Sequence, residues 1–502
     1  MIKKDTVVHP FLFALYPVLS LYAYNIDRTP FYVILVPALL ALTLTLILLF
    51  LSKRVVRDSA KAGIVTTIML VFFFSYGHIF YSFLIQLHIG GLHIGRERYM
   101  FPAYIVFSAS AIYAALLIMK KRQISGGTTQ FLNMMAAILV LLCAVNIIKP
   151  LNTSSRGNDR NLPGSEEKMA APESLRDIYY IVPDMYASAS TLREVYGYDN
   201  SVFTEFLESR GFYIADKSRS NYPITDLSLA SSLNMEYLDY LREVVGEKKE
   251  DRAVLLNKVK DNNVRRLLKS YGYRYIQFCS GYGVTEKNPY ADMNYCSYGF
   301  FSEYLKVLID TTIFSSFYGN YIEPNIIRNR VGYVYEELPR VPYIEGPKFT
   351  LVHLPVPHYP YVFGPNGEKL SPLIKTNDKG RYLDQLIYVS RTLPPIIDQI
   401  LSRSKLQPII VIQADHGPDN TGTLVSPTDD FLKERLNILN AYYLPGKAKN
   451  PLYKSISPVN SFRLIFNLYF NTDFKLLKDT SYVSKYEDLY NFRDISSEKL
   501  EY

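Results

Sequence analysis

Cysteine and histidine are scarce in this chain. Its 502 residues include three cysteines and seven histidines, and no two cysteines have the Cys-x-x-Cys spacing of thiolate metal sites. The cysteines therefore do not form a metal-binding Cys-x-x-Cys pair. Basic patches interleaved with aromatic residues are also missing, and loop residues that orient a membrane protein account for part of the net charge of +8. The charge thus does not indicate a nucleic-acid partner.

Long apolar runs dominate the first 150 residues. Five of them reach the length that a helix needs to cross a bilayer, namely residues 9–26, 31–52, 63–87, 101–119 and 131–149. The first run is short and contains Pro17 and several tyrosines, so a signal peptide is the alternative interpretation. Four more runs follow it without a clear small-residue cleavage site. This pattern favours a five-helix transmembrane domain over residues 1–149.

The loops between the runs differ in basic charge. Basic residues on one side are Lys3, Lys4, Lys53, Arg54, Arg57, Lys61, Lys120, Lys121 and Arg122, and those on the other are Arg28, Arg96 and Arg98. Because cytoplasmic loops carry the excess of Lys and Arg, we predict a cytoplasmic N-terminus and an outer location for everything after residue 149. Arg96 and Arg98, in an outer loop, are candidates to hold a lipid phosphate, with interfacial anchoring as the alternative.

The rest of the chain has the pattern of a tether followed by an α/β domain. Residues 150–176 are polar and rich in Pro, Gly, Ser and Asn, which predicts a linker. In residues 177–470, short apolar strands alternate with helices, and this alternation predicts a mostly parallel sheet covered by helices on both faces. Residues 471–502 are left as a C-terminal extension.

Polar side chains follow several of the predicted strands. Asp415 and His416 stand directly after an apolar strand, and Asp184 ends the first strand of the domain. Open α/β sheets bind ligands at the carboxyl ends of their strands, so these side chains can meet at one edge. Thr225 adds a hydroxyl at a predicted helix N-terminus, where free amides favour an anion such as phosphate. His358 follows another strand and lies outside this set.

This residue set suits one zinc or manganese ion, because it offers two carboxylates, one imidazole and one alkoxide. A metal touching the Thr225 hydroxyl would lower its pKa and let it attack phosphorus or sulfur. His358 would bind phosphoryl oxygens or protonate the leaving group. The outer domain has three histidines, fewer than a two-metal site commonly uses.

Each of these residues also has a purely structural explanation. Asp184 suits a strand-end turn, Thr225 or Asp226 suits a helix cap, and His358 lies among prolines and suits a surface turn. His353 lies in the middle of a strand, where a hydrogen-bonded core histidine is commoner than a ligand. A core role and a substrate contact both stay open for His353.

In combination, the motifs resemble the alkaline phosphatase/sulfatase superfamily. The segments that carry the resemblance are Asp184 after its strand, Thr225-Asp-Leu-Ser-Leu-Ala-Ser231, His353-Leu-Pro-Val-Pro-His358 and Asp415-His416-Gly417. The second segment is similar to the nucleophile helix of membrane phosphoethanolamine transferases, and the third to their paired-histidine strand and loop. Five spans before an external domain also resemble lipoteichoic acid synthases. The resemblance implies an alkaline phosphatase-like fold, Thr225 as nucleophile and a metal held by the first, second and fourth segments.

The chain departs from these families at several positions. Neither Cys279 nor Cys296 begins the Cys-x-Pro-x-Arg motif whose cysteine becomes formylglycine in sulfatases. Asp184 stands where the transferases usually have Glu, and Gly417-Pro418 differs from their Gly-Glu-Ser. On an oxidising outer side the two cysteines would form a disulfide, and two free thiols are the alternative.

These observations predict a metal-dependent, sulfatase-like enzyme of a bacterial cell membrane, with its catalytic domain in a periplasm or outside the cell. We expect it to transfer a phospho-headgroup from a membrane lipid to an envelope glycan or lipid through a covalent phospho-threonine at Thr225. A hydrolase that uses water as the acceptor and a non-catalytic partner in envelope assembly are the alternatives.

Overall fold

The computed structural model describes residues 6–26, 29–80, 88–89, 92–93, 97–121, 126–151, 174–246, 250–297, 302–370, 378–446 and 451–497. The chain divides into two compact units. The helical unit consists of Met1–Asp159 and Gly299–Gly319, and the α/β unit consists of Arg160–Tyr298 and Asn320–Tyr502. The sequence places residues 299–319 inside the predicted outer domain, whereas the structure groups them with the first 159 residues.

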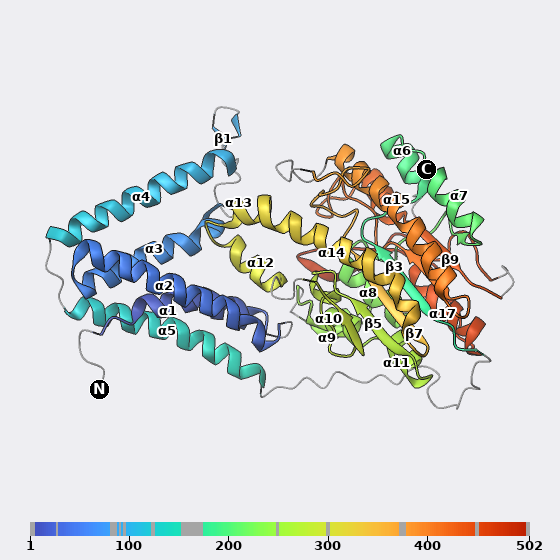
Figure 1. Cartoon of the computed structure of the whole chain (residues 1–502), viewed down its shortest axis with the longest axis horizontal. Helices are drawn as coiled ribbons and strands as arrows, with labels where there is room; N and C mark the ends of the chain where they lie inside the picture. The colour runs from blue at the N-terminus through green and yellow to red at the C-terminus, as the bar shows by residue number, and fades with distance from the viewer. Residues whose placement is uncertain are drawn as a thin grey trace. The chain divides into compact units, whose positions relative to one another are not determined.

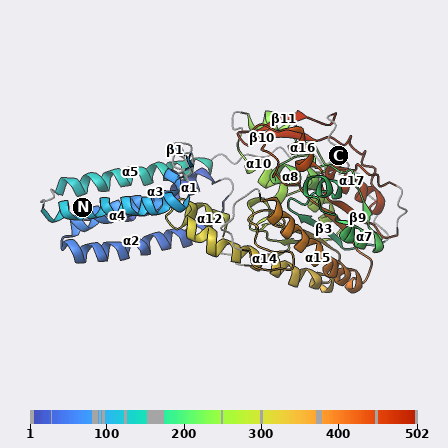
Figure 2. The same cartoon turned by 90° about the horizontal axis from the view of Figure 1, so that it is seen from above.

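The helical unit is built from long apolar helices. They are α1 (His9–Tyr24), α2 (Leu35–Val56), which follows the short η1 (Phe31–Ile34), α3 (Ser59–Ile79), α4 (Glu97–Lys121) and α5 (Gly126–Leu151). Helices α1, α2, α3 and α5 pack side by side (Figures 1 and 2). Two short strands, β1 (His88–Ile89) and β2 (Leu92–His93), pair in antiparallel fashion between α3 and α4. The segments α12 (Glu303–Asp310) and α13 (Ser315–Phe317) complete the unit.

Four helical segments of the described chain are long and apolar enough to cross a membrane. They are Phe31–Val56, Ser59–Ile79, Tyr99–Lys121 and Gly127–Ile148. Large side chains such as Leu39, Phe107 and Leu141 are exposed on these segments, as lipid-facing residues are. Helix α1 has 16 residues. At 1.5 Å per residue it reaches about 24 Å, less than the roughly 30 Å hydrocarbon core of a bilayer. The predicted count of five spans is therefore not confirmed, and the side on which each loop lies stays a prediction.

The α/β unit is organised around a seven-stranded sheet with the order β4-β9-β8-β3-β7-β5-β6. The strands are β3 (Ile178–Pro183), β4 (Tyr213–Ile214), β5 (Arg274–Phe278), β6 (Met293–Tyr295), β7 (Lys348–Leu354), β8 (Ile409–Gln413) and β9 (Asn440–Tyr443). The run from β8 to β6 is parallel, whereas β9 pairs in antiparallel fashion with both β8 and β4. The predicted mostly parallel sheet is confirmed.

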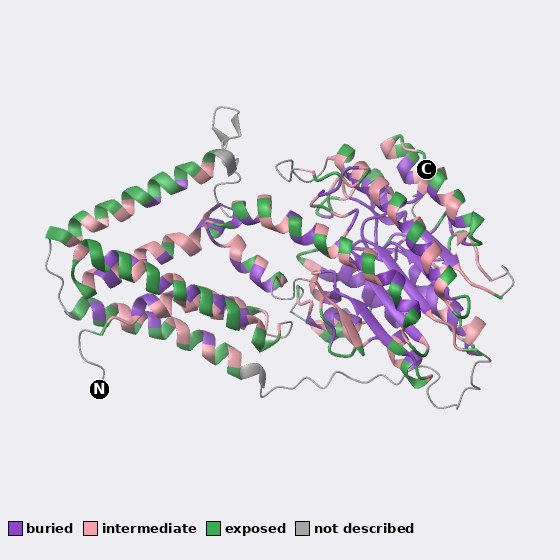
Figure 3. Ribbon diagram, viewed as in Figure 1, coloured by how far each residue is buried: buried purple, intermediate pink, exposed green. Residues whose placement is uncertain are grey.

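Helices cover both faces of this sheet. Alternate residues of β3 enter two different core clusters, because successive strand side chains point to opposite faces. One face is covered by α8 (Thr225–Asn234), α10 (Ala253–Lys260), α11 (Asn263–Ser270) and α17 (Pro458–Tyr469). The other is covered by α6 (Ala189–Tyr196), α7 (Ser201–Ser209), α14 (Glu323–Glu337) and α15 (Lys379–Arg403). Figure 3 shows the central strands as buried and the outer helix faces as exposed.

Shorter elements complete the α/β unit. They are α9 (Leu241–Val245), η3 (Gly283–Thr285), η4 (Tyr318–Ile322), η5 (Leu338–Tyr343), α16 (Asp429–Leu436), β10 (Tyr482–Lys485) and β11 (Asp488–Asp494), of which η4 begins at the unit boundary. The strands β10 and β11 form a hairpin whose Val483, Leu489 and Tyr490 are buried in the same core as α8. Residues set aside as a C-terminal extension thus contribute buried side chains to this core.

Candidate functional site

The candidate site lies where three neighbouring parallel strands end. Strand β3 pairs with β8 on one side and with β7 on the other, so the carboxyl ends of all three share one edge of the sheet. Asp184 follows β3 directly, and its backbone N–H donates to the carbonyl of Leu354 at the end of β7 (3.0 Å). Asp415 and His416 follow β8 after a single alanine. The sheet therefore brings these side chains to one place.

Asp184, Asp415 and His416 form a buried group whose ligand atoms all lie within 4.8 Å of one another. The Nε2 atom of His416 is 3.3 Å from Asp415 Oδ2 and 3.9 Å from Asp184 Oδ1. Neither of these carboxylate oxygens has a hydrogen-bond partner. A buried acceptor without a donor is costly, and two such acceptors facing one point fit a cation. The donor set thus suits a divalent metal ion.

The hydrogen bonding of His416 leaves one ring nitrogen able to bind a cation. Its Nδ1 is 3.0 Å from the carbonyl oxygen of Gly417, which can only accept, so Nδ1 carries the proton and Nε2 keeps its lone pair. The turn itself is tightly packed, because a Cβ at Gly417 would lie 2.0 Å from the carbonyl oxygen of Glu434. Only glycine fits at this position.

Asp184 and Asp415 are both buried, but their pKa values shift in opposite directions. Burial tends to raise the pKa of Asp184, but attraction to His358, His353 and His416 outweighs it and holds the pKa below the usual range. Burial and repulsion from Asp184 raise the pKa of Asp415 to about 7. Two adjacent carboxylates do not both ionise easily without a positive charge between them.

Thr225 is the first residue of α8 and lies beside this group. Its Oγ1 is 3.0 Å from His416 Nε2, and the residue is buried. The N-cap position belongs to Ile224, and no side chain caps this helix through a hydrogen bond. The alternative that Thr225 or Asp226 serves as the helix cap is therefore wrong. Asp226 instead pairs with Arg252 (2.9 Å).

His353 occupies the hydrogen-bonded core position that was one of its two alternatives, and its substrate contact stays a prediction. The ring is buried in β7, and its Nδ1 lies 2.7 Å from the hydroxyl of Thr285. Its Nε2 is 3.4 Å from Asp184 Oδ2. Burial lowers the pKa of His353, but the interaction with Asp184 and its negative charge reverse this and leave the pKa raised. Thr285 thus orients a histidine whose other nitrogen faces Asp184.

His358 and the two loop arginines stand apart from the buried group. His358 is half-buried, its Nδ1 lies 2.5 Å from the carbonyl oxygen of Tyr359, and its influence on Asp184 is electrostatic. The predicted role of Arg96 lies outside the described residues. Arg98 belongs to the first turn of α4, but its side chain is likewise outside the description.

Arg435 was not found by sequence reasoning. It is buried in α16, and its guanidinium donates to the carbonyls of Pro223 (2.8 Å) and Gly417 (3.0 Å). Its Nη2 is 3.3 Å from His416 Nε2, so a positive charge borders the candidate metal site. Burial and this charge together lower the pKa of His416. An arginine in an amphipathic helix carries no sequence signal that distinguishes it from a surface residue.

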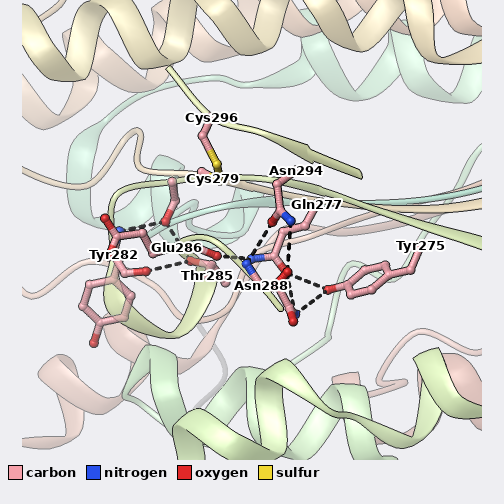
Figure 4. Close-up of a disulfide and its surroundings, with 10 residues drawn as sticks. Tyr275, Gln277, Cys279, Tyr282, Thr285, Glu286, Asn288, Asn294 and Cys296 are labelled. Carbon is pink, nitrogen blue, oxygen red and sulfur yellow. Dashed lines mark hydrogen bonds between the residues drawn. A yellow bond between two sulfur atoms is a disulfide. The ribbon is translucent and has the colours of Figure 1, made fainter. Parts of the chain in front are cut away.

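For the two cysteines of the α/β unit, the sequence left a disulfide and two free thiols as alternatives. Cys279 and Cys296 form a disulfide, with their Cα atoms 4.9 Å apart (Figure 4). They follow the adjacent strands β5 and β6, so the bond closes the loop that carries Thr285. The disulfide alternative is therefore the one that the structure adopts. Disulfides persist in oxidising compartments, which agrees with an extracytoplasmic α/β unit.

The chain is similar to several solved structures, all at low sequence identity. The C-terminal periplasmic domain of EcEptC from Escherichia coli is 12% identical over 66% of this chain and 95% of that one, with a TM-score of 0.45. The corresponding domain of the phosphoethanolamine transferase EptC from Campylobacter jejuni is 14% identical over 64% and 95%, with a TM-score of 0.38. An alkaline phosphatase superfamily protein from Vibrio parahaemolyticus is 14% identical over 62% and 74%, with a TM-score of 0.40.

One structure of the Escherichia coli domain is a complex with zinc. No family model and no curated protein sequence matches the chain. At these identities and TM-scores the similarity is distant, and the function proposed below rests on the side chains of the site.

Proposed function

We propose that this protein is a membrane-anchored, metal-dependent transferase that uses Thr225 as a nucleophile on a phosphodiester. The donor would be a membrane phospholipid, and the acceptor a hydroxyl of an envelope glycan or lipid. The observation that carries the proposal is the position of the Thr225 hydroxyl, 3.0 Å from His416 Nε2 in a buried site with two unpartnered carboxylate oxygens. A threonine with a structural role has no need of such surroundings.

Asp184, Asp415, His416 and Thr225 would hold one zinc or manganese ion. When bound, the ion supplies positive charge that lowers the pKa of the Thr225 hydroxyl and offsets the charge that develops on the phosphoryl group. The residues are prepared for this role before any ion binds. Gly417 fixes the tautomer of His416, and two backbone N–H groups, those of Met185 (3.4 Å) and His416 (3.0 Å), hold Asp415 Oδ1.

The reaction proceeds in two displacements. The Thr225 hydroxyl gives its proton to solvent, and its Oγ forms a bond to phosphorus while the bond from phosphorus to the donor's leaving oxygen breaks. This leaving oxygen takes a proton from His358. In the second displacement the acceptor hydroxyl gives its proton to His358 and attacks phosphorus, the bond to Thr225 Oγ breaks, and Oγ takes a proton back from solvent. His358 suits this exchange because it is half-buried and remains within electrostatic reach of Asp184.

Transfer is favoured over hydrolysis by the helical unit. One spanning helix is sufficient to anchor a domain, and the described part of this chain has four segments long and apolar enough to span. The additional helices offer a surface on which a lipid donor or a lipid-linked acceptor can be held at the membrane. A site that used water as acceptor would have no use for them.

Trapping of the covalent intermediate tests whether Thr225 is the nucleophile. The full-length protein in phospholipid liposomes should gain the mass of one phospho-headgroup in intact mass spectrometry, and Thr225→Val should not. Thr204→Val is a matched control, because Thr204 lies in the first turn of α7 and its hydroxyl bonds within its own helix. An adduct of equal yield in Thr225→Val would exclude this nucleophile.

The acceptor class is tested with a labelled phospholipid. Label that moves to an added glycan or lipid acceptor supports the transferase, whereas label released only as a free headgroup, with or without acceptors, shows a hydrolase. Metal analysis of the purified full chain tests the third alternative. Less than about one divalent ion per chain after equilibration with zinc or manganese would favour a non-catalytic partner.

A further inference from the structure

One segment from the middle of the α/β sequence belongs to the helical unit. Residues 303–317, comprising α12, α13 and the turn between them, are called the clasp here (Figure 1). Residues 160–298 and 320–502 belong to the α/β unit, whereas the clasp groups with α1, α2, α3 and α5. The α/β unit is thus joined to the helical unit at the linker and also through the clasp.

The clasp packs against the apolar helices through α12. Tyr304 and Leu308 are buried in a cluster with Val18 and Tyr22 of α1, among others. The hydroxyl of Tyr304 donates to the carbonyl of Val18 at 2.5 Å. Two turns of α12 therefore combine apolar burial with a specific hydrogen bond to the backbone of α1.

The closest contact joins the turn after α12 to the backbone of α3. The N–H of Gly77 donates to the carbonyl of Thr311 (3.0 Å), and the N–H of Ile313 donates to the carbonyl of Phe73 (3.1 Å). In a regular α-helix the N–H of residue 77 and the carbonyl of residue 73 pair with each other, so here both also have partners in the clasp. Backbone pairing of this kind is specific, because unsatisfied backbone groups are costly in apolar surroundings.

Gly77 permits this approach. A Cβ at position 77 would lie 2.0 Å from the carbonyl oxygen of Asp310 and 2.8 Å from the Cα of Thr311. Phe314 of the clasp packs edge-to-face on Phe73, with ring centroids 5.4 Å apart. Glycine at 77 is therefore explained by the clasp.

The contacts lie at one end of the helix bundle. Val18 and Tyr22 lie in the C-terminal half of α1, and Phe73 and Gly77 are near the C-terminal end of α3. The basic residues Lys53 and Arg54 lie at the C-terminal end of α2, which runs in the opposite direction to α3 because the two packed helices are joined by a two-residue turn. The clasp thus occupies the end that the positive-inside rule assigns to the outer face.

From these contacts we infer that the clasp is a second attachment of the α/β unit to the membrane helices, independent of the predicted linker at residues 150–176. Its partner is the surface formed by the ends of α1 and α3 in the same chain. This inference does not depend on the proposed chemistry, because none of the clasp residues belongs to the candidate site.

The attachment is tested by cutting the linker in the intact protein. A protease site inserted between residues 160 and 165 of the full chain, followed by cleavage in detergent, leaves two fragments with no covalent connection. When the N-terminal fragment is captured by a tag, the C-terminal fragment should co-elute. Detergent removes the bilayer, so co-elution reports the contact between the fragments. Loss of the wild-type C-terminal fragment on cleavage would overturn the inference.

Point variants test which residues make the contact between the clasp and the helices. Gly77→Leu should reduce co-elution by at least about tenfold, since a side chain at 77 would overlap the clasp backbone. Gly332→Ala in α14 is the control, because a Cβ there meets nothing within 4 Å. If Gly77→Leu does not fold, Tyr304→Phe combined with Leu308→Ala tests the other side of the same contact. Co-elution unchanged in a folded Gly77→Leu protein and in the double variant would also overturn the inference.

Discussion

Metal affinity should fall as the pH falls through the pKa of Asp415. Burial and the neighbouring Asp184 raise that pKa to about 7, so a proton competes with the metal ion for this carboxylate near neutral pH. Asp184 and His416 do not add to the effect. The pKa of Asp184 is held below its usual range and that of His416 well below its own, so both keep their ligating forms across neutral pH.

The size of the effect follows from one titrating group. With a pKa near 7, about nine-tenths of Asp415 is ionised at about pH 8 and about one-tenth at about pH 6, so affinity should fall about tenfold between them. The direction of the change in metal affinity follows from the raised pKa, because the metal-free site then binds a proton that the metal must displace. Affinity rises with pH and levels off above the pKa.

Isothermal titration of the purified full-length protein with zinc, at about pH 6, 7 and 8, measures this dependence. Asp415→Asn is the matched variant: its affinity should be lower throughout and should not change with pH over this range. Equal wild-type affinity at the three pH values would refute the reasoning. So would a pH dependence that persists in Asp415→Asn, since another group would then be titrating.

Two further predictions concern the loop closed by the disulfide. Thr285→Val should lower turnover without changing the metal content, because it removes the hydrogen bond that orients His353, and a turnover rate equal to that of wild type would show that this bond is not needed. Replacing Cys279 and Cys296 by serine should destabilise the α/β unit by about 3 kcal/mol, the value expected for a closed loop of this size. The two cysteines are 17 residues apart. Denaturant unfolding of the oxidised protein and the variant measures this difference, and equal midpoints would contradict it.

The sequence was most informative where the chemistry is local. The apolar strands β3, β7 and β8 were predictable because a short run of β-branched and aromatic residues between turn residues specifies a buried strand. Asp184, Asp415 and His416 could be placed together from this alone, since the carboxyl ends of parallel strands share an edge. The five-span count was less secure, because α1 is an apolar helix of only 16 residues.

Several features depend on contacts between distant segments. Thr225 had the composition of a helix cap, and only packing against β8 shows that its hydroxyl faces His416. Three further features also depend on contacts between distant segments. They are the charge of Arg435 beside His416, the hydrogen bond between Thr285 and His353, and the disulfide between Cys279 and Cys296.

By itself, then, the amino-acid sequence determined the apolar helices, the parallel sheet and the candidate ligands at its edge, because hydrophobic periodicity and turn residues act over a few positions. Tertiary structure decided which nitrogen of His416 is free, what surrounds it, and that residues 303–317 lie against α1 and α3. Those outcomes depend on which buried polar and backbone groups find partners across the fold, and no local pattern records such pairings.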